Sequence, residues 1–146
     1  KYQISAKQLE LEITENVLVQ DMELVVSKLQ RLTKHGIQIA VDDFGMGYSS
    51  LSYLQTLPLS NLKIDRSFIA TIQSRGDKNS IISAIVAMAK ELGLHIVAEG
   101  VETQVQMDYI KKIGCPTVQG FWYGHPMPVE ELKLIALEQF HTAQTA

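Results

Sequence analysis

Two adjacent aspartates stand at the end of an apolar run near the middle of the chain. Residues 37–44 read IQIAVDDF, so Asp42 and Asp43 follow a segment that is expected to be a buried strand. Neighbouring carboxylates repel each other, and an unpaired buried charge costs still more free energy. The pair therefore either lies on a solvated loop or is neutralised by a positive group.

Other predicted strands carry a polar residue at the equivalent position. Side chains alternate between the two faces of a strand, so residues two apart in the sequence point to the same face and share a parity. The apolar residues of each predicted strand share one parity, and we expect helices to cover that face. One polar residue of the opposite parity stands near the C-terminal end of each strand: Glu12, Asp42, Lys63, Glu99 and Gln119. A single such residue is usually a solvated rim residue, but five in succession indicate a shared site.

Clustered carboxylates beside one lysine indicate a site for divalent cations. Ligand sets made only of oxygen select Mg²⁺, Mn²⁺ or Ca²⁺. We expect Asp42 to bridge two ions and Asp43 to bind one of them, because paired ions activate water and stabilise in-line displacement at phosphorus. Lys63 would hold the attacking water or a phosphate oxygen. The glycines that follow Phe44, beginning with Gly45, let the chain turn tightly beside the ions.

The elements that must position these side chains alternate along the whole chain. Strands are predicted at residues 9–14, 37–44, 61–68, 95–102 and 117–122, and helices at residues 21–36, 49–58, 79–93, 104–114 and 129–140. Thr103 and Gln106 have the spacing of a capping box. This alternation predicts a parallel sheet covered by helices, either a doubly wound sheet or a (β/α) barrel. The first strand is not followed by a glycine-rich phosphate-binding segment, which weakens the dinucleotide-binding version.

Composition limits the classes of partner. A length of 146 residues suits one domain, and a net charge of -3 offers no basic field for a nucleic acid polymer or an anionic membrane. The single cysteine, Cys115, excludes an internal disulfide and suits a reducing compartment. No apolar run approaches the ~20 residues of a membrane span. We expect a cytoplasmic protein, or the cytoplasmic part of a larger membrane or multidomain signalling protein.

Five motifs, in this order, resemble the EAL domain family of bacterial cyclic di-GMP phosphodiesterases. They are LEITE (11–15), DDFGMGYSSL (42–51), LKIDRSF (62–68), AIVAMAKELGLHIVAEGVET (84–103) and GCPTVQGFWYGHPMP (114–128). The resemblance covers nearly the whole chain. It implies hydrolysis of one phosphodiester bond of cyclic di-GMP to give linear pGpG, on a TIM-like (β/α) barrel that holds two Mg²⁺ or Mn²⁺ ions.

The resemblance also implies individual roles for the site residues. Glu12 and Asp42 resemble ligands of the first metal, with Asp42 bridging, whereas Asp43 and Glu99 resemble ligands of the second. Lys63 resembles the lysine that contacts the catalytic water. Four residues resemble substrate-binding or supporting positions: Gln119, Glu15, Phe44 and Gly45. Glu15 resembles the glutamate that steadies the loop after the aspartate pair, in which Met46 replaces the usual threonine.

Residues 1–146 resemble the C-terminal part of a single EAL domain, because the Glu-Ala-Leu motif and a further metal-binding asparagine lie upstream of LEITE in the family. The expected fold is therefore a partial barrel of five parallel strands. Its open edges predict poor solubility, or association as a homodimer or through those edges, and poor packing of Ala40 and Val97. The alternative function is a catalytically inactive module that binds cyclic di-GMP or a protein. The metal-site residues favour the enzyme.

Overall fold

The computed structural model describes residues 3–14, 22–45, 51–74 and 79–144. A short 3-10 helix, η1, precedes a run of alternating strands and helices. In chain order the elements are η1 (Ala6–Gln8), β1 (Glu10–Thr14), α1 (Met22–Lys34), β2 (Gln38–Phe44), α2 (Leu51–Thr56), β3 (Asn61–Ile64), α3 (Arg66–Ala70), α4 (Ser80–Glu91), β4 (His95–Glu99), α5 (Gln104–Lys112), β5 (Thr117–Gln119) and α6 (Val129–Gln144).

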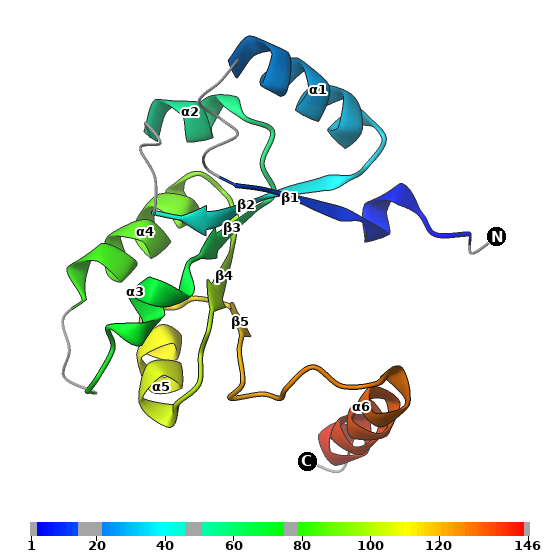
Figure 1. The fold of residues 1–146 in the computed structure, drawn as a ribbon, viewed down its shortest axis with the longest axis vertical. Coiled ribbons are helices and arrows are strands. Elements are labelled where there is room, and N and C mark those ends of the chain that lie inside the picture. Colours follow the sequence, from blue (N-terminus) through cyan, green and yellow to red (C-terminus); the bar gives the residue numbers. More distant parts are fainter. Residues whose placement is uncertain (1–2, 15–21, 46–50, 75–78, 145–146) are drawn as a thin grey trace.

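The strands form one parallel sheet in which each strand lies beside its predecessor in the sequence, in the order β1-β2-β3-β4-β5. A doubly wound sheet reverses its strand order at a switch point, whereas the wall of a (β/α) barrel does not. Figure 1 shows α1 to α5 on one side of the sheet, with the opposite face open and α6 lying apart from it. The predicted partial TIM-like barrel is therefore confirmed.

The core lies between the sheet and its helices, as the parity of the strands predicts. The strand residues Ile39, Val41, Leu62, Ile64, Ile96 and Ala98 are at most 1% exposed, and they pack in part against Ile82, Val86 and Ala89 of α4. Burying a side chain of this size contributes about 2 kcal/mol to folding. Packing is looser at edge strand β1, where the side chains of Leu9 and Leu11 are 46% and 41% exposed. Among Leu9, Leu11 and Ile13, which share this face of the first predicted strand, only Ile13 packs against the core.

One predicted strand is wrong in its second half. Residues 61–68 were expected to be a single strand, but β3 ends at Ile64 and α3 begins at Arg66. The Asp65 carboxylate accepts a hydrogen bond from the Ser67 N–H at 2.9 Å, which caps the helix and ends the strand. The capping box of Thr103 and Gln106 is confirmed at the start of α5. Strands β4 and β5 also end earlier than predicted.

The packing of the open face corrects a second prediction. Ala40 was expected to be poorly packed, yet it is fully buried, whereas Val97 is half-buried. Two contacts between β1 and β3 cross β2 on this face, one joining Asn61 to Glu10 and the other joining Lys63 to Glu12. Because Ala40 lies in register with Glu12 and Asn61, these longer side chains cover its methyl group. Within the described residues, no helix is long and apolar enough to cross a membrane.

Candidate metal centre

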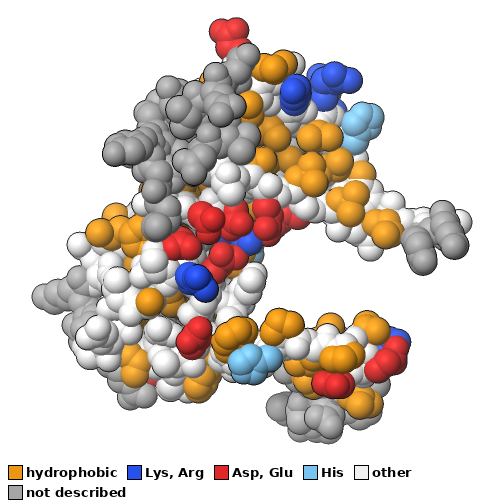
Figure 2. All heavy atoms as spheres, in the orientation of Figure 1, with side chains coloured by type: hydrophobic (Ala, Val, Ile, Leu, Met, Phe, Trp, Pro, Cys, Tyr) orange, Lys and Arg blue, Asp and Glu red, His pale blue; other side chains and the backbone are white. Residues whose placement is uncertain are grey.

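Four charged side chains meet on the open face at the C-terminal ends of neighbouring strands. Glu12, Asp42, Lys63 and Glu99 come from β1, β2, β3 and β4. In Figure 2 acidic side chains gather around a basic one in the middle of this face. The C-terminal rim of a (β/α) barrel is where such folds build their active sites. The predicted convergence of these residues is therefore present in the structure.

The Lys63 ammonium is the hub of the cluster. Its Nζ atom donates hydrogen bonds to Glu12 Oε1 at 2.7 Å and to Glu99 Oε1 at 2.8 Å, and it lies 3.3 Å from Asp42 Oδ1. The side chain is only 8% exposed. Burial alone would lower the pKa of Lys63, but the hydrogen bonds to Glu12 and Glu99 outweigh it and raise the pKa above its ordinary value. The ammonium is therefore charged and links β3 to carboxylates of three other strands, β1, β2 and β4.

Three of the carboxylates have the spacing of a cation site. Ligand oxygens of Asp42, Asp43 and Glu99 all lie within 4.8 Å of one another. Burial raises the pKa of Glu99, against the opposing effect of Lys63. Partial desolvation, followed by the nearby charges of Asp42 and Asp65, raises the pKa of Asp43. A divalent cation would relieve this repulsion, and an oxygen-only donor set fits Mg²⁺ or Mn²⁺.

A bulge explains how two successive residues of one strand reach the same site. Successive side chains normally point to opposite faces, so Asp43 should turn away from Asp42. The pairing of β2 with β3 shifts between Val41 and Phe44, and Asp43 adopts a positive φ of 52°. The Asp43 N–H donates to Asp42 Oδ1 at 3.1 Å. The irregularity redirects the second carboxylate towards the first, as bulges beside functional sites do.

Sequence reasoning missed Asp65. Its carboxylate caps α3 through the Ser67 N–H and is close enough to Asp43 to raise the pKa of that group. The same cap lowers the pKa of Asp65, although burial acts in the opposite direction. Two signals could have found it: Asp65 has the same strand parity as Lys63, and Asp-x-Ser is a helix-capping pattern.

The predicted supporting residues lie around the cluster rather than within it. Gln119 ends β5 as the register partner of Glu99, and its side chain is exposed. The Phe44 side chain is buried in the core. Gly45 lies against the Phe68 ring, where an added Cβ would stand 2.6 Å from Cε2. Their functional roles stay predictions. Glu15 and Met46 lie outside the described residues.

Replacing Lys63 by Met should lower the free energy of unfolding of the metal-free chain by about 3 kcal/mol, because it leaves a partly buried carboxylate cluster without its cation. Urea unfolding measures this loss. Lys133→Met is the matched control, since Lys133 and Glu130 form an ion pair at 3.1 Å with side chains 62% and 77% exposed. Such exposed pairs contribute about 0–1 kcal/mol. Equal effects of the two variants would contradict the central role of Lys63.

Comparison with known proteins gives consistent matches. The family model for the EAL domain matches residues 1–126. The bifunctional diguanylate cyclase/cyclic di-GMP phosphodiesterase MucR of Pseudomonas aeruginosa is 46% identical over 132 residues, covering 90% of this chain and 19% of that protein. The cyclic di-GMP phosphodiesterase NbdA of the same organism is also 46% identical over 132 residues, covering 90% of this chain and 16% of its own length.

Solved structures agree with the sequence matches. The structure of the MucR phosphodiesterase in complex with cyclic di-GMP superposes with a TM-score of 0.81 at 46% identity, covering 88% of this chain and 52% of that one. A manganese and cyclic di-GMP complex of Klebsiella pneumoniae BlrP1 gives a TM-score of 0.76 at 32% identity, covering 84% and 31%. The chain thus spans about half of the solved MucR phosphodiesterase and less than a fifth of the full-length MucR and NbdA proteins.

Proposed function

Because the chain belongs to the EAL domain family, we propose that it forms the C-terminal part of a domain that hydrolyses cyclic di-GMP to linear pGpG with the help of Mg²⁺ or Mn²⁺. The observation that carries this proposal is the group formed by Asp42, Asp43 and Glu99 beside the Lys63 ammonium. A relative whose solved structure is a complex with manganese and cyclic di-GMP supports the choice of cation and substrate.

Hydrolysis requires a new oxygen–phosphorus bond from water and cleavage of one ester bond of the cyclic dinucleotide. The proton released by the water ends on the departing 3′ oxygen, so the product carries a 5′ phosphate and a free 3′ hydroxyl. Bound divalent ions would supply charge stabilisation and an acidic water. Asp42, Asp43 and Glu99 would hold the ions, with Glu12 as a further ligand. Lys63 would orient the attacking water or a phosphate oxygen.

The structure also suits the second candidate, a module that binds cyclic di-GMP without cleaving it. Lys63 contacts carboxylates from three other strands, and these ion pairs would hold the face together in a module that does not catalyse hydrolysis. Metal dependence separates the two functions, since hydrolysis needs the cation and such a binding module does not.

The setting and assembly of the chain are further parts of the proposal. The buried free thiol of Cys115 agrees with a reducing, cytoplasmic location. Strands β1 and β5 are the edges of the sheet, and open edges favour pairing with another chain. We therefore infer that the chain associates through these edges, with itself or with the remainder of an EAL domain.

A chimera tests the function. Joining the N-terminal half of the EAL domain of MucR to this chain (the MucR chimera) should give a protein that converts cyclic di-GMP to pGpG with Mn²⁺. Excess EDTA should stop the reaction, because the carboxylate cluster then holds no cation. Chromatographic separation of pGpG from substrate measures both results. Tight binding of cyclic di-GMP without any pGpG would favour the inactive module instead.

A further inference from the structure

The loop between β4 and α5 (residues 100–103, the β4–α5 loop) follows Glu99 directly and is fixed at each of its residues. Gly100 has φ +70° and lies against α3, where an added Cβ would stand 2.5 Å from Arg66 Cβ. Val101 is fully buried. The backbone N–H groups of Glu102 and Thr103 both donate to Gln106 Oε1, at 2.8 and 3.0 Å.

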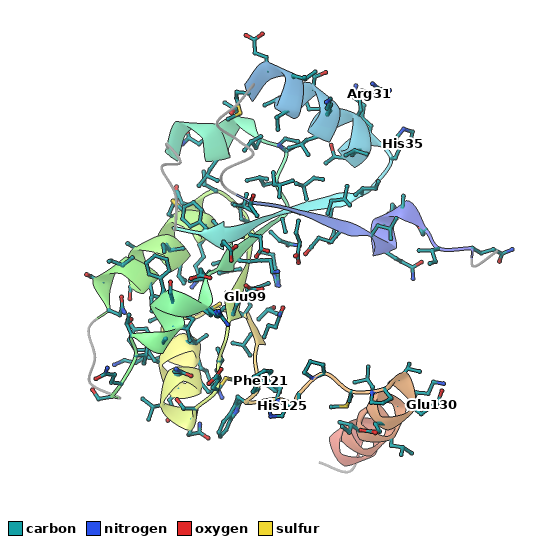
Figure 3. All side chains as sticks on the ribbon, in the orientation of Figure 1. Arg31, His35, Glu99, Phe121, His125 and Glu130 are labelled. Atoms are coloured by element: carbon teal, nitrogen blue, oxygen red, sulfur yellow. The ribbon has the colours of Figure 1, made fainter. Side chains whose placement is uncertain are left out.

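Val101 joins this loop to the end of β5. Its N–H donates to Gln119 O at 3.1 Å, and its carbonyl accepts the Trp122 N–H at 2.9 Å. A Cβ on Gly120 would stand 2.2 Å from Val101 O, so the two backbones lie too close for a side chain at residue 120. Figure 3 shows Glu99 at the end of β4 and Phe121 on the segment that follows β5. The β5 side of Glu99 is therefore well fixed.

On its β3 side, the Glu99 side chain is held by Lys63 Nζ at 2.8 Å, and the backbone beyond Glu99 is held by a further contact. The pairing of β3 with β4 ends at Ile64 and Ala98, one residue before Glu99. Beyond that point, α3 follows β3 and α5 follows β4, and Gln106 Nε2 donates to Ile69 O at 3.3 Å between the two helices. Gln106 is buried, at 8% exposure, so this hydrogen bond is made away from solvent. It links the segment after Lys63 to the loop after Glu99.

We propose that Gln106 is a positioning residue for the metal centre, holding the β4–α5 loop against α3 and thereby setting the place of Glu99 beside Asp42 and Asp43. This inference rests on the proposed metal-dependent function. The Gln106 Oε1 atom accepts hydrogen bonds from the loop, and its Nε2 atom donates a hydrogen bond to α3. Both polar atoms of the side-chain amide therefore take part in holding the loop against α3. Residues that orient metal ligands are often as important for affinity as the ligands.

Replacing Gln106 by Glu separates its two uses. The carboxylate still accepts the N–H groups of Glu102 and Thr103, but it cannot donate to Ile69 O at pH 8. The Mn²⁺ dissociation constant of the chain, measured by titration calorimetry, should rise about tenfold. The same substitution at Gln104, an exposed residue of the same helix that contacts Asp108, should leave it unchanged. If Q106E does not fold, the same titration is made with Gln106→Met, which keeps the side-chain volume, carries no charge and removes both the contact to the loop and the contact to Ile69.

Thr103→Ala shows whether the effect is merely structural. This change removes the hydroxyl that accepts the Gln106 N–H at 3.3 Å but leaves the link to Ile69 in place. It should lower Tm while Mn²⁺ affinity stays unchanged, because loss of a cap destabilises the helix without moving Glu99. Equal affinity of Q106E and wild type, or equal loss of affinity in T103A and Q106E, would overturn the proposal.

A metal-free measurement keeps the inference separate from the function on which it rests. Amide hydrogen exchange at Glu102 and Thr103, whose N–H groups donate to the side chain of residue 106, should be about tenfold faster in Q106E than in Q104E, because that side chain is then no longer held to Ile69 O of α3. A wild-type chain that binds no Mn²⁺ would refute the proposed metal site itself. In that case the positioning role is decided by exchange alone, and equal rates in the two variants would refute it.

Discussion

Asp42→Asn in the MucR chimera is expected to abolish hydrolysis of cyclic di-GMP. Asp42 lies within reach of both Asp43 and Glu99 and also 3.3 Å from the Lys63 ammonium, so its charge acts on every part of the centre. Asparagine keeps the shape but removes one of the negative charges that attract the cation. Losing about 4 kcal/mol of transition-state stabilisation would slow turnover roughly a thousandfold. Rates of pGpG formation at saturating substrate measure the change.

The same variant should bind Mn²⁺ weakly while remaining folded. Asp42 is half-buried, and replacing its charge also leaves one carboxylate fewer for Lys63 to neutralise, so the fold loses little. Asp108→Asn is the matched control, because Asp108 lies on α5, where it contacts Gln104, and takes no part in the cluster. Turnover of D42N close to that of D108N would eliminate the assignment of Asp42 as a metal ligand.

Much of the site could be predicted because it follows from the two-residue period of a strand. Five residues were placed on one face by parity alone. Four of them meet there, namely Glu12, Asp42, Lys63 and Glu99, whereas Gln119 is exposed at the end of β5. Neighbouring strands in parallel register bring equivalent positions together, so no knowledge of the loops was needed. The order of strands and helices was predictable for a similar reason, since apolar periodicity and caps are local.

The parts that could not be predicted depend on local geometry that overrides periodicity. Asp43 was predicted to bind an ion, but the bulge and the positive φ through which it reaches the site do not follow from strand periodicity. The strand predicted through residue 68 fails at Asp65, where a side-chain cap competes with strand pairing. Ala40 is buried by contacts between side chains of two other strands, which only the folded register reveals.

The chain on its own is expected to associate, and to gain activity when the N-terminal half of an EAL domain is supplied. Leu9, just before edge strand β1, and Leu11, on that strand, are both exposed. Helix α6 lies apart from the sheet in Figure 1 and carries further exposed apolar residues: Val129, Leu132, Leu134 and Ile135. Unpaired edges and apolar surface of this kind favour contact with another chain. Alone, the chain should elute as a dimer or larger species and form almost no pGpG.

Mixing the chain with the separately produced N-terminal half of the EAL domain of MucR should change both properties together. Closing the barrel would cover both edges, and the added half would bring the further metal ligands that we expect upstream of LEITE. A one-to-one complex should therefore form, and pGpG production should rise at least about tenfold. Size-exclusion chromatography coupled to the hydrolysis assay follows both. The D42N chain is the control, because it should form the same complex and remain inactive. The opposite result would be a stable monomer that cleaves cyclic di-GMP as fast as the MucR chimera. Such a result would contradict the prediction, because neither the open sheet edges nor the lack of further metal ligands would then limit the activity of the chain.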